Sequence, residues 1–224
     1  HSDGTVDAEA LPALLRPETR LVSVMAANNE TGVLQPLARI GALLREHRPQ
    51  GDVRLHTDAV QAFGRIALPL AEWGVDAVTI AAHKLGGPKG IGALAFTGNS
   101  EPPPLLLGGA QERDRRAGTE SVLLAGGFAA AVDWVQRNGT GLAERLAVLR
   151  SRLEQRLLRM EGAFINGGEA PRVPNTSNLG FHGVAARDLL VALDLSGVAV
   201  STGSACSSGA LTPSPVLKAM GLRG

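Results

Sequence analysis

The sequence contains little cysteine and little lysine, and it has no long apolar run. Cys206 is the single cysteine among 224 residues, so no intrachain disulfide can form, which fits a reducing compartment. We find no secretory signal and no apolar run of bilayer-spanning length. These absences argue against a secreted or membrane-spanning protein. We therefore expect a cytoplasmic protein without a membrane partner.

The sequence also has no excess of positive or negative charge. The net charge is +1 at pH 7, and the arginines are scattered along the chain rather than clustered. A basic stripe would be expected for a nucleic-acid partner, and none is present. Five histidines and one cysteine occur at no metal-binding spacing, and no Walker pattern occurs. We therefore expect neither a nucleic-acid partner nor a resident metal.

Apolar strand-like segments alternate with amphipathic helical segments in the first part of the chain. The helical segment after Pro36 has an apolar stripe. Strands are expected at 21–25, 53–58, 76–80 and 91–96. This alternation predicts an α/β fold, with a mainly parallel sheet flanked by helices.

The second part of the chain predicts a smaller α+β domain. Two helices are expected to begin near Ser121 and Gly141, and the segment RNGTG between them is the best candidate boundary. We therefore divide the chain into a large domain at 1–138 and a small C-terminal domain at 139–224, which carries the loop around Cys206. Both chain ends look like interior pieces of a longer fold, so we expect both domains to be incomplete.

Polar residues gather where three of the predicted strands end. These residues are Asn28 and Asn29 after the first strand, Asp58 and Gln61 after the second, and His83 and Lys84 after the third. In an open α/β sheet, ligands bind at the carboxyl ends of the strands. Each residue alone is explained equally well as a loop-capping or surface residue. Together they predict a binding site at one edge of the sheet.

Lys84 is informative because the chain has only three lysines against nineteen arginines. Arginine serves a surface charge equally well, but only lysine can lose a proton and form an imine. An ordinary surface lysine remains the alternative interpretation. Asp58, at a neighbouring strand end, is a suitable partner for a protonated pyridine nitrogen. An imine-forming lysine combined with such a carboxylate is the arrangement that binds pyridoxal 5'-phosphate.

Several segments, taken together, resemble a known family. They are VMAANNETGVLQPLARIG, HTDAVQAFG, AHKLGGPKGIGAL, GGAQERDRRAGTES and VSTGSACSSGALTPSPVLKAMG. Their order and spacing resemble cysteine desulfurases of the NifS/IscS-like branch of the class V aminotransferases. The resemblance implies a homodimeric fold-type I pyridoxal phosphate enzyme. Such an enzyme removes sulfur from L-cysteine, releases L-alanine and delivers the sulfur to an acceptor or scaffold protein for iron–sulfur cluster assembly or thiolation.

The resemblance also implies roles for individual residues. Lys84 would form the imine with the cofactor, and Asp58 would pair with its pyridine nitrogen. Gln61 and Asn29 would bind the ring hydroxyl, and Asn29 would also lie near the substrate carboxylate. His83 would bind the phosphate, and Thr119 would bind the phosphate of the neighbouring subunit. Cys206 would attack the substrate sulfur and become a persulfide. A transient bond from Cys206 to an iron–sulfur cluster is a further role considered for this thiol.

The chain departs from the family pattern in several places. Ala81 stands where a serine or threonine usually bonds the phosphate, Asp114 replaces a usual glycine, and Pro215 stands where a histidine is common. The family's upstream phosphate loop, its ring-stacking histidine and its downstream carboxylate-binding arginine are not within residues 1–224. We therefore expect weakened cofactor retention in this chain alone.

Three alternatives stay open at this point. The first is a selenocysteine lyase, because the same residues handle selenium. The second is another class V enzyme of the aminotransferase type, which has no need of a thiol such as Cys206. The third is a truncated, non-catalytic remnant that only dimerises or binds partners.

Overall fold

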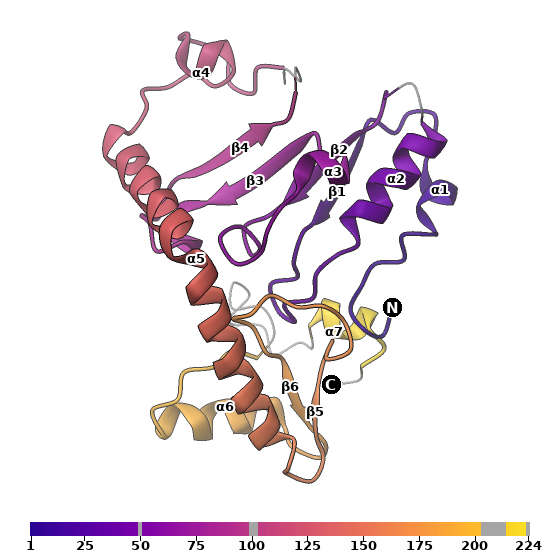
Figure 1. The fold of residues 1–224 in the computed structure, drawn as a ribbon, viewed down its shortest axis with the longest axis vertical. Coiled ribbons are helices and arrows are strands. Elements are labelled where there is room, and N and C mark those ends of the chain that lie inside the picture. The colour runs from indigo at the N-terminus through magenta and orange to yellow at the C-terminus, as the bar shows by residue number, and fades with distance from the viewer. Residues whose placement is uncertain (49–50, 99–102, 203–213, 223–224) are drawn as a thin grey trace. The chain divides into compact units, whose positions relative to one another are not determined.

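The structure is a computed structural model that describes residues 1–48, 51–98, 103–202 and 214–222 (Figure 1). It divides into two compact units. The sheet unit comprises Ala8–Ala26 and Pro36–Gly141, and the small unit comprises His1–Asp7, Ala27–Gln35 and Leu142–Gly224. No helix among the described residues is both long and apolar enough to cross a membrane. The assignment of domains to 1–138 and 139–224 stays a prediction.

The sheet unit is built on four strands. They are β1 (Leu21–Met25), β2 (Arg54–Asp58), β3 (Ala77–Ala81) and β4 (Gly92–Phe96), hydrogen-bonded in that order (Figure 1). The pairs β1–β2 and β2–β3 are parallel, whereas β4 runs antiparallel to β3. The predicted mainly parallel α/β sheet is therefore confirmed. Each strand lies within one residue of its expected position.

One face of the sheet is covered by three helices, α1 (Leu11–Leu14), α2 (Leu37–His47) and α3 (Leu70–Trp73). The predicted stripe of α2 is confirmed, because Leu37, Ile40, Leu43 and Leu44 are all buried. This stripe packs on Leu55 of β2 in the main apolar cluster. Burial alternates along β2, so Arg54, His56 and Asp58 point to the opposite face. The core therefore lies on the side of the sheet away from Asp58.

The long helix α5 (Val122–Leu157) corrects the prediction of two helices separated by RNGTG. It continues through this segment, and the boundary between the two units falls inside it, after Gly141. Gly139 explains the continuity, since a Cβ there would lie 3.3 Å from the carbonyl oxygen of Gly64. The glycine thus permits close approach of the helix to a turn, and it does not mark a helix end.

The small unit contains a short antiparallel pair, β5 (Ala163–Ile165) and β6 (Leu179–Phe181). Two further helices follow, α6 (Ala186–Leu195) and α7 (Pro215–Ala219). Ser214 caps α7, because its hydroxyl accepts the Val216 and Leu217 N–H groups at 3.0 and 3.3 Å. Cys206 lies outside the described residues.

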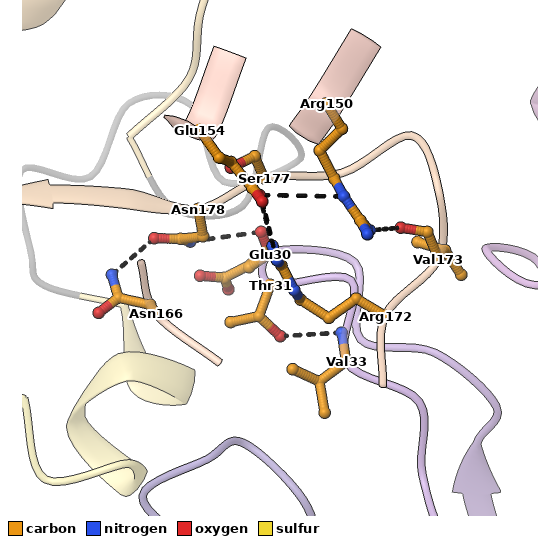
Figure 2. A network of polar contacts seen from close by, with 10 residues as sticks. All are labelled: Glu30, Thr31, Val33, Arg150, Glu154, Asn166, Arg172, Val173, Ser177 and Asn178. Carbon is orange, nitrogen blue, oxygen red and sulfur yellow. Dashed lines mark hydrogen bonds and ion pairs between the residues drawn. The ribbon is translucent and has the colours of Figure 1, made fainter. Parts of the chain in front are cut away.

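Within the small unit, a buried ion pair joins the C-terminal part of α5 to the segment between β5 and β6 (Figure 2). Arg172 donates to both oxygens of Glu154, Nη1 to Oε1 at 2.7 Å and Nη2 to Oε2 at 3.0 Å. The Ser177 hydroxyl donates to Glu154 Oε1 at 2.7 Å. The side chains of Glu154 and Arg172 are only 10% and 7% exposed. Two well-aligned charge-assisted bonds compensate for the burial of these charges.

Burial raises the pKa of Glu154, but hydrogen bonds from Arg172 and Ser177 and the charges of Arg172 and Arg150 lower it by more. The net pKa lies below its ordinary value. A pKa lower in the folded than in the unfolded state means that this carboxylate stabilises the fold above the unfolded pKa. That contribution is lost as the pH falls through the folded-state pKa.

We expect Glu154→Gln to reduce the free energy of unfolding at neutral pH by about 3 kcal/mol, because Arg172 keeps a buried charge without its counter-ion. Chemical denaturation measures this difference. The exposed Glu144 on the same helix offers the matched control Glu144→Gln, which should change little. The difference between the free energies of unfolding of the two variants should become smaller as the pH is lowered below 4.5. Equal stabilities at neutral pH would contradict the assigned role of the pair.

Candidate active site

Asp58 is the last residue of β2 and lies at the carboxyl edge of the parallel strands. It is paired in register with Met25 of β1 and with Thr79 of β3. Its backbone carbonyl accepts the Ala26 N–H at 2.8 Å, and its Oδ1 accepts the Val60 N–H at 2.9 Å. The side chain is exposed. The strand end thus fixes a carboxylate that a ligand can reach.

Lys84 and His83 follow directly after β3 in the short 3₁₀ turn η1 (Ala82–Lys84). The fully buried Ala82 anchors the turn, because its carbonyl accepts the Leu85 and Gly87 N–H groups at 2.9 and 3.0 Å. Lys84 is half-buried, whereas His83 is exposed. The turn therefore holds an amine and an imidazole at the strand end next to Asp58.

The N-terminal part of α5 supports this turn through close glycine contacts. A Cβ on Gly127 would lie 3.0 Å from Pro88 Cγ, and a Cβ on Gly87 would lie 3.1 Å from Ala131 Cβ. Larger side chains at these positions would push the turn away from the helix. Gly87 and Gly127 therefore permit the close approach of the segment after Lys84 to α5.

The turns that carry Gln61 and Lys84 meet at one guanidinium group. Arg65 Nη1 donates to the Gln61 carbonyl at 3.0 Å and to the Val60 carbonyl at 3.3 Å, and Nη2 donates to the Lys84 carbonyl at 3.1 Å. Gln61 itself is half-buried. The structure therefore brings the segments of Asp58, Gln61, His83 and Lys84 together in the sheet unit. Nothing in the sequence distinguishes Arg65 from the other arginines.

His56 joins three strands on the face that carries Asp58. Its Nδ1 lies 2.8 Å from Ser23 Oγ of β1, and its Nε2 lies 2.8 Å from Thr79 Oγ1 of β3. His56 precedes Asp58 by two residues, so both point to the same face of the sheet. Sequence reasoning did not select His56, although the two-residue spacing within the segment HTD was the available signal.

The remaining predicted site residues lie elsewhere. Asn29 belongs to the small unit and is exposed, in a turn closed by the buried Asn28. Asn28 Oδ1 accepts the backbone N–H groups of Glu30 and Thr31 at 2.9 and 3.0 Å. Thr119 belongs to the sheet unit and is exposed in the segment before α5. Their predicted roles stay predictions, and Cys206 lies outside the described residues.

Two departures from the family pattern acquire a structural meaning. Ala81 is the last residue of β3, so the missing hydroxyl would have stood beside η1. Asp114 ends the short helix α4 (Gln111–Asp114) with a φ of 63°, in the left-handed region that glycine adopts readily. Glu112 and Arg113 share this conformation, with φ of 50° and 57°. The backbone thus keeps a glycine-type conformation after glycine has been replaced.

Comparison with known proteins supplies further context. The model of the family described as Aminotransferase class-V matches residues 1–224. A protein named cysteine desulfurase IscS from Dictyoglomus turgidum is 41% identical over 219 residues, which cover 97% of this chain and 55% of that protein. A cysteine desulfurase from a Nostoc species is 43% identical over 223 residues, which cover 99% and 55% of the two chains.

A solved structure gives the same result for the fold. The crystal structure of a NifS-like protein from Rickettsia africae superposes with a TM-score of 0.88 at 33% identity, covering 100% of this chain and 59% of that one. The chain spans about half the length of the curated relatives it matches. The family model covers the whole chain, and the predicted family resemblance is confirmed. This chain belongs to the aminotransferase class-V family, whose members are pyridoxal phosphate enzymes.

Proposed function

We propose that the protein to which this chain belongs is a pyridoxal phosphate-dependent cysteine desulfurase. The observation that carries the proposal is the meeting of the Asp58–Gln61 and His83–Lys84 segments at the carboxyl edge of one parallel sheet. The names of relatives at 41–43% identity support the choice of L-cysteine as substrate. A selenocysteine lyase, another class V enzyme of the aminotransferase type and a non-catalytic remnant stay alternatives, but no observation on the described residues favours any of them.

The residues of the site fit the cofactor by their chemistry. Lys84 would supply an amine for the imine, and Asp58 would supply a carboxylate for the protonated pyridine nitrogen. Gln61 and His83 would supply hydrogen-bond donors for the ring hydroxyl and the phosphate. When bound, the cofactor accepts the electron pair left on the substrate as its bonds break. The family resemblance adds Asn29, and Thr119 of a neighbouring subunit, to the proposed set.

The chain's own residues have distinct tasks in this proposal. Asp58, anchored by its bond to the Val60 N–H, keeps a proton on the ring nitrogen and so preserves the electron-accepting form of the ring. Lys84 Nζ would hold the cofactor through its amine, and as a free amine it would carry a proton at the same site.

Cys206 is proposed to carry the sulfur. Its thiolate forms a bond to the substrate sulfur while the bond between that sulfur and the substrate β-carbon breaks. The electron pair passes to the substrate portion, which takes up protons and leaves as L-alanine. The atoms balance, because one L-cysteine and one thiol give one L-alanine and one persulfide. A sequence rich in serine and glycine around Cys206 suits a thiol that must enter the site and later meet an acceptor.

A homodimer is part of the same proposal. Strongly exposed apolar side chains flank Thr119 in the sequence, among them Leu107 at 87% and Leu123 at 90% exposure. Such side chains suit burial in a subunit interface. An interface here would carry Thr119 towards a neighbouring subunit, as the family resemblance implies. A sulfur-acceptor or scaffold protein as second partner and a cytoplasmic location remain predictions.

Asp58→Asn tests the assignment of the ring-nitrogen partner. The asparagine Oδ1 still accepts the Val60 N–H, so we expect an unchanged melting temperature. Turnover should fall about 10- to 150-fold, because a charge-assisted hydrogen bond contributes about 1.5–3 kcal/mol. Alanine release by the complete enzyme measures this loss. The control Asp133→Asn changes an exposed side chain on α5. Wild-type turnover in Asp58→Asn would remove Asp58 from the mechanism.

A further inference from the structure

Arg65 is a charged side chain whose hydrogen bonds all go to neutral backbone groups. Its guanidinium donates to the carbonyls of Val60, Gln61 and Lys84. Among the described residues, no carboxylate forms an ion pair with it within 4.0 Å. Burial lowers the pKa of Arg65 from its ordinary value. A half-buried cation without a counter-ion destabilises the fold, so we look for a role of Arg65 that compensates for this cost.

The geometry of the group suggests what that purpose is. The guanidinium is a planar fork with five donors in fixed directions. One terminal nitrogen holds the turn after β2, and the other holds the turn after β3. Because the two nitrogens are rigidly connected, they fix the separation between the carbonyls of Gln61 and Lys84. A lysine ammonium is a single point donor and cannot set such a spacing.

The proposed cofactor requires a fixed spacing of this kind. In pyridoxal phosphate, the aldehyde carbon is attached to the ring carbon opposite the pyridine nitrogen, so one rigid aromatic ring fixes the distance between them. Lys84 must reach the first while Asp58 pairs with the second. Asp58 and Gln61 lie in the segment on one side of the guanidinium, and Lys84 lies in the segment on the other side. If the Lys84 turn and the Asp58–Gln61 turn were too close together or too far apart, either Lys84 could not reach the aldehyde carbon or Asp58 could not reach the pyridine nitrogen.

We propose that Arg65 is a positioning residue that sets the distance between the Lys84 turn and the Asp58–Gln61 turn for imine formation. The proposal rests on the proposed function, because it concerns the same cofactor. Arg65 touches neither substrate nor cofactor in this account. It acts through the backbone of Gln61 and Lys84.

The test uses the complete protein and measures cofactor binding in two backgrounds. Arg65→Lys and Arg65→Met are made with Lys84 present and with Lys84→Ala, and pyridoxal phosphate affinity is measured by fluorescence titration. Borohydride trapping followed by peptide mass spectrometry measures the imine at Lys84. We expect both variants to weaken affinity about tenfold when Lys84 is present and less than twofold in the Lys84→Ala background. The trapped fraction should fall in parallel.

Controls separate positioning from general stability. Arg137→Lys changes an exposed arginine on α5 and should leave affinity and trapping unchanged. Methylguanidinium added to the alternative variant Arg65→Ala should restore trapping, whereas methylammonium should not, because only the former has the planar fork. If a substituted protein has a lower melting temperature, this rescue still distinguishes a positioning role of Arg65 from a purely stabilising one.

The outcomes are distinct. Equal loss of affinity in both backgrounds, or normal trapping in Arg65→Lys, would overturn the positioning role while leaving the proposed function intact. If the unsubstituted protein forms no trapped adduct at all, the proposed function fails and this proposal fails with it. Preferential loss in the Lys84 background, with rescue by methylguanidinium, supports it.

Discussion

Lys84→Ala is expected to abolish the imine with pyridoxal phosphate and to reduce desulfuration to the background rate. Lys84 is the half-buried amine of η1, held at the strand end beside Asp58. Alanine cannot form an imine, and it cannot carry a proton at this position. The backbone of η1 should persist, because its bonds are accepted by the Ala82 carbonyl and no Lys84 side-chain atom takes part in them.

Borohydride reduction and peptide mass spectrometry measure the adduct. The matched control is Lys89→Ala, which removes an exposed lysine from the same glycine-rich segment. The control should keep a full adduct on Lys84 and normal alanine release. An adduct of wild-type yield in Lys84→Ala, carried by Lys89 or Lys218, would show that the imine-forming residue has been wrongly assigned.

Cys206→Ser is expected to eliminate persulfide formation while leaving cofactor binding unchanged. Serine is almost isosteric with cysteine, so we expect the protein to tolerate the substitution. A hydroxyl at neutral pH is a far poorer nucleophile towards sulfur than a thiolate. The complete enzyme should therefore bind pyridoxal phosphate with normal affinity and lose at least about 100-fold in alanine release.

The cofactor spectrum and the release of alanine together measure this result. A substrate-dependent change in the spectrum should survive in Cys206→Ser, since it depends on Lys84 and Asp58. Lys84→Ala serves as the comparison, because it should lose both the substrate-dependent spectral change and alanine release. Alanine release at the wild-type rate from Cys206→Ser would falsify the role of Cys206 as nucleophile.

The parallel sheet and the edge where the site residues collect could be predicted from the sequence. Strand periodicity and the α2 stripe depend on local alternation of apolar residues, and the sequence displays this directly. The rule that ligands bind at the carboxyl ends of strands then places Asp58, Gln61, His83 and Lys84 at one edge. The structure brings their segments together as this rule requires.

The parts that sequence reasoning missed depend on contacts between distant residues. Gly139 resembles a helix break until its close contact with the Gly64 carbonyl is known. Arg65 gains its importance only from bonds to two separate turns, and His56 only from the hydroxyls of Ser23 and Thr79. A local pattern carries no information about such partners. The left-handed backbone at Asp114 could not be predicted either, because aspartate does not indicate a positive φ as glycine does.

One single-turnover reaction tests the central claim most directly. The complete protein, loaded with pyridoxal phosphate and kept free of reductant, is mixed with L-cysteine, and alanine and the mass of the GSACSS peptide are measured together. We predict one L-alanine per subunit and the gain of one sulfur on Cys206, reversed by reductant. Alanine without sulfur on Cys206, or no alanine at all from the fully loaded enzyme, would contradict the account.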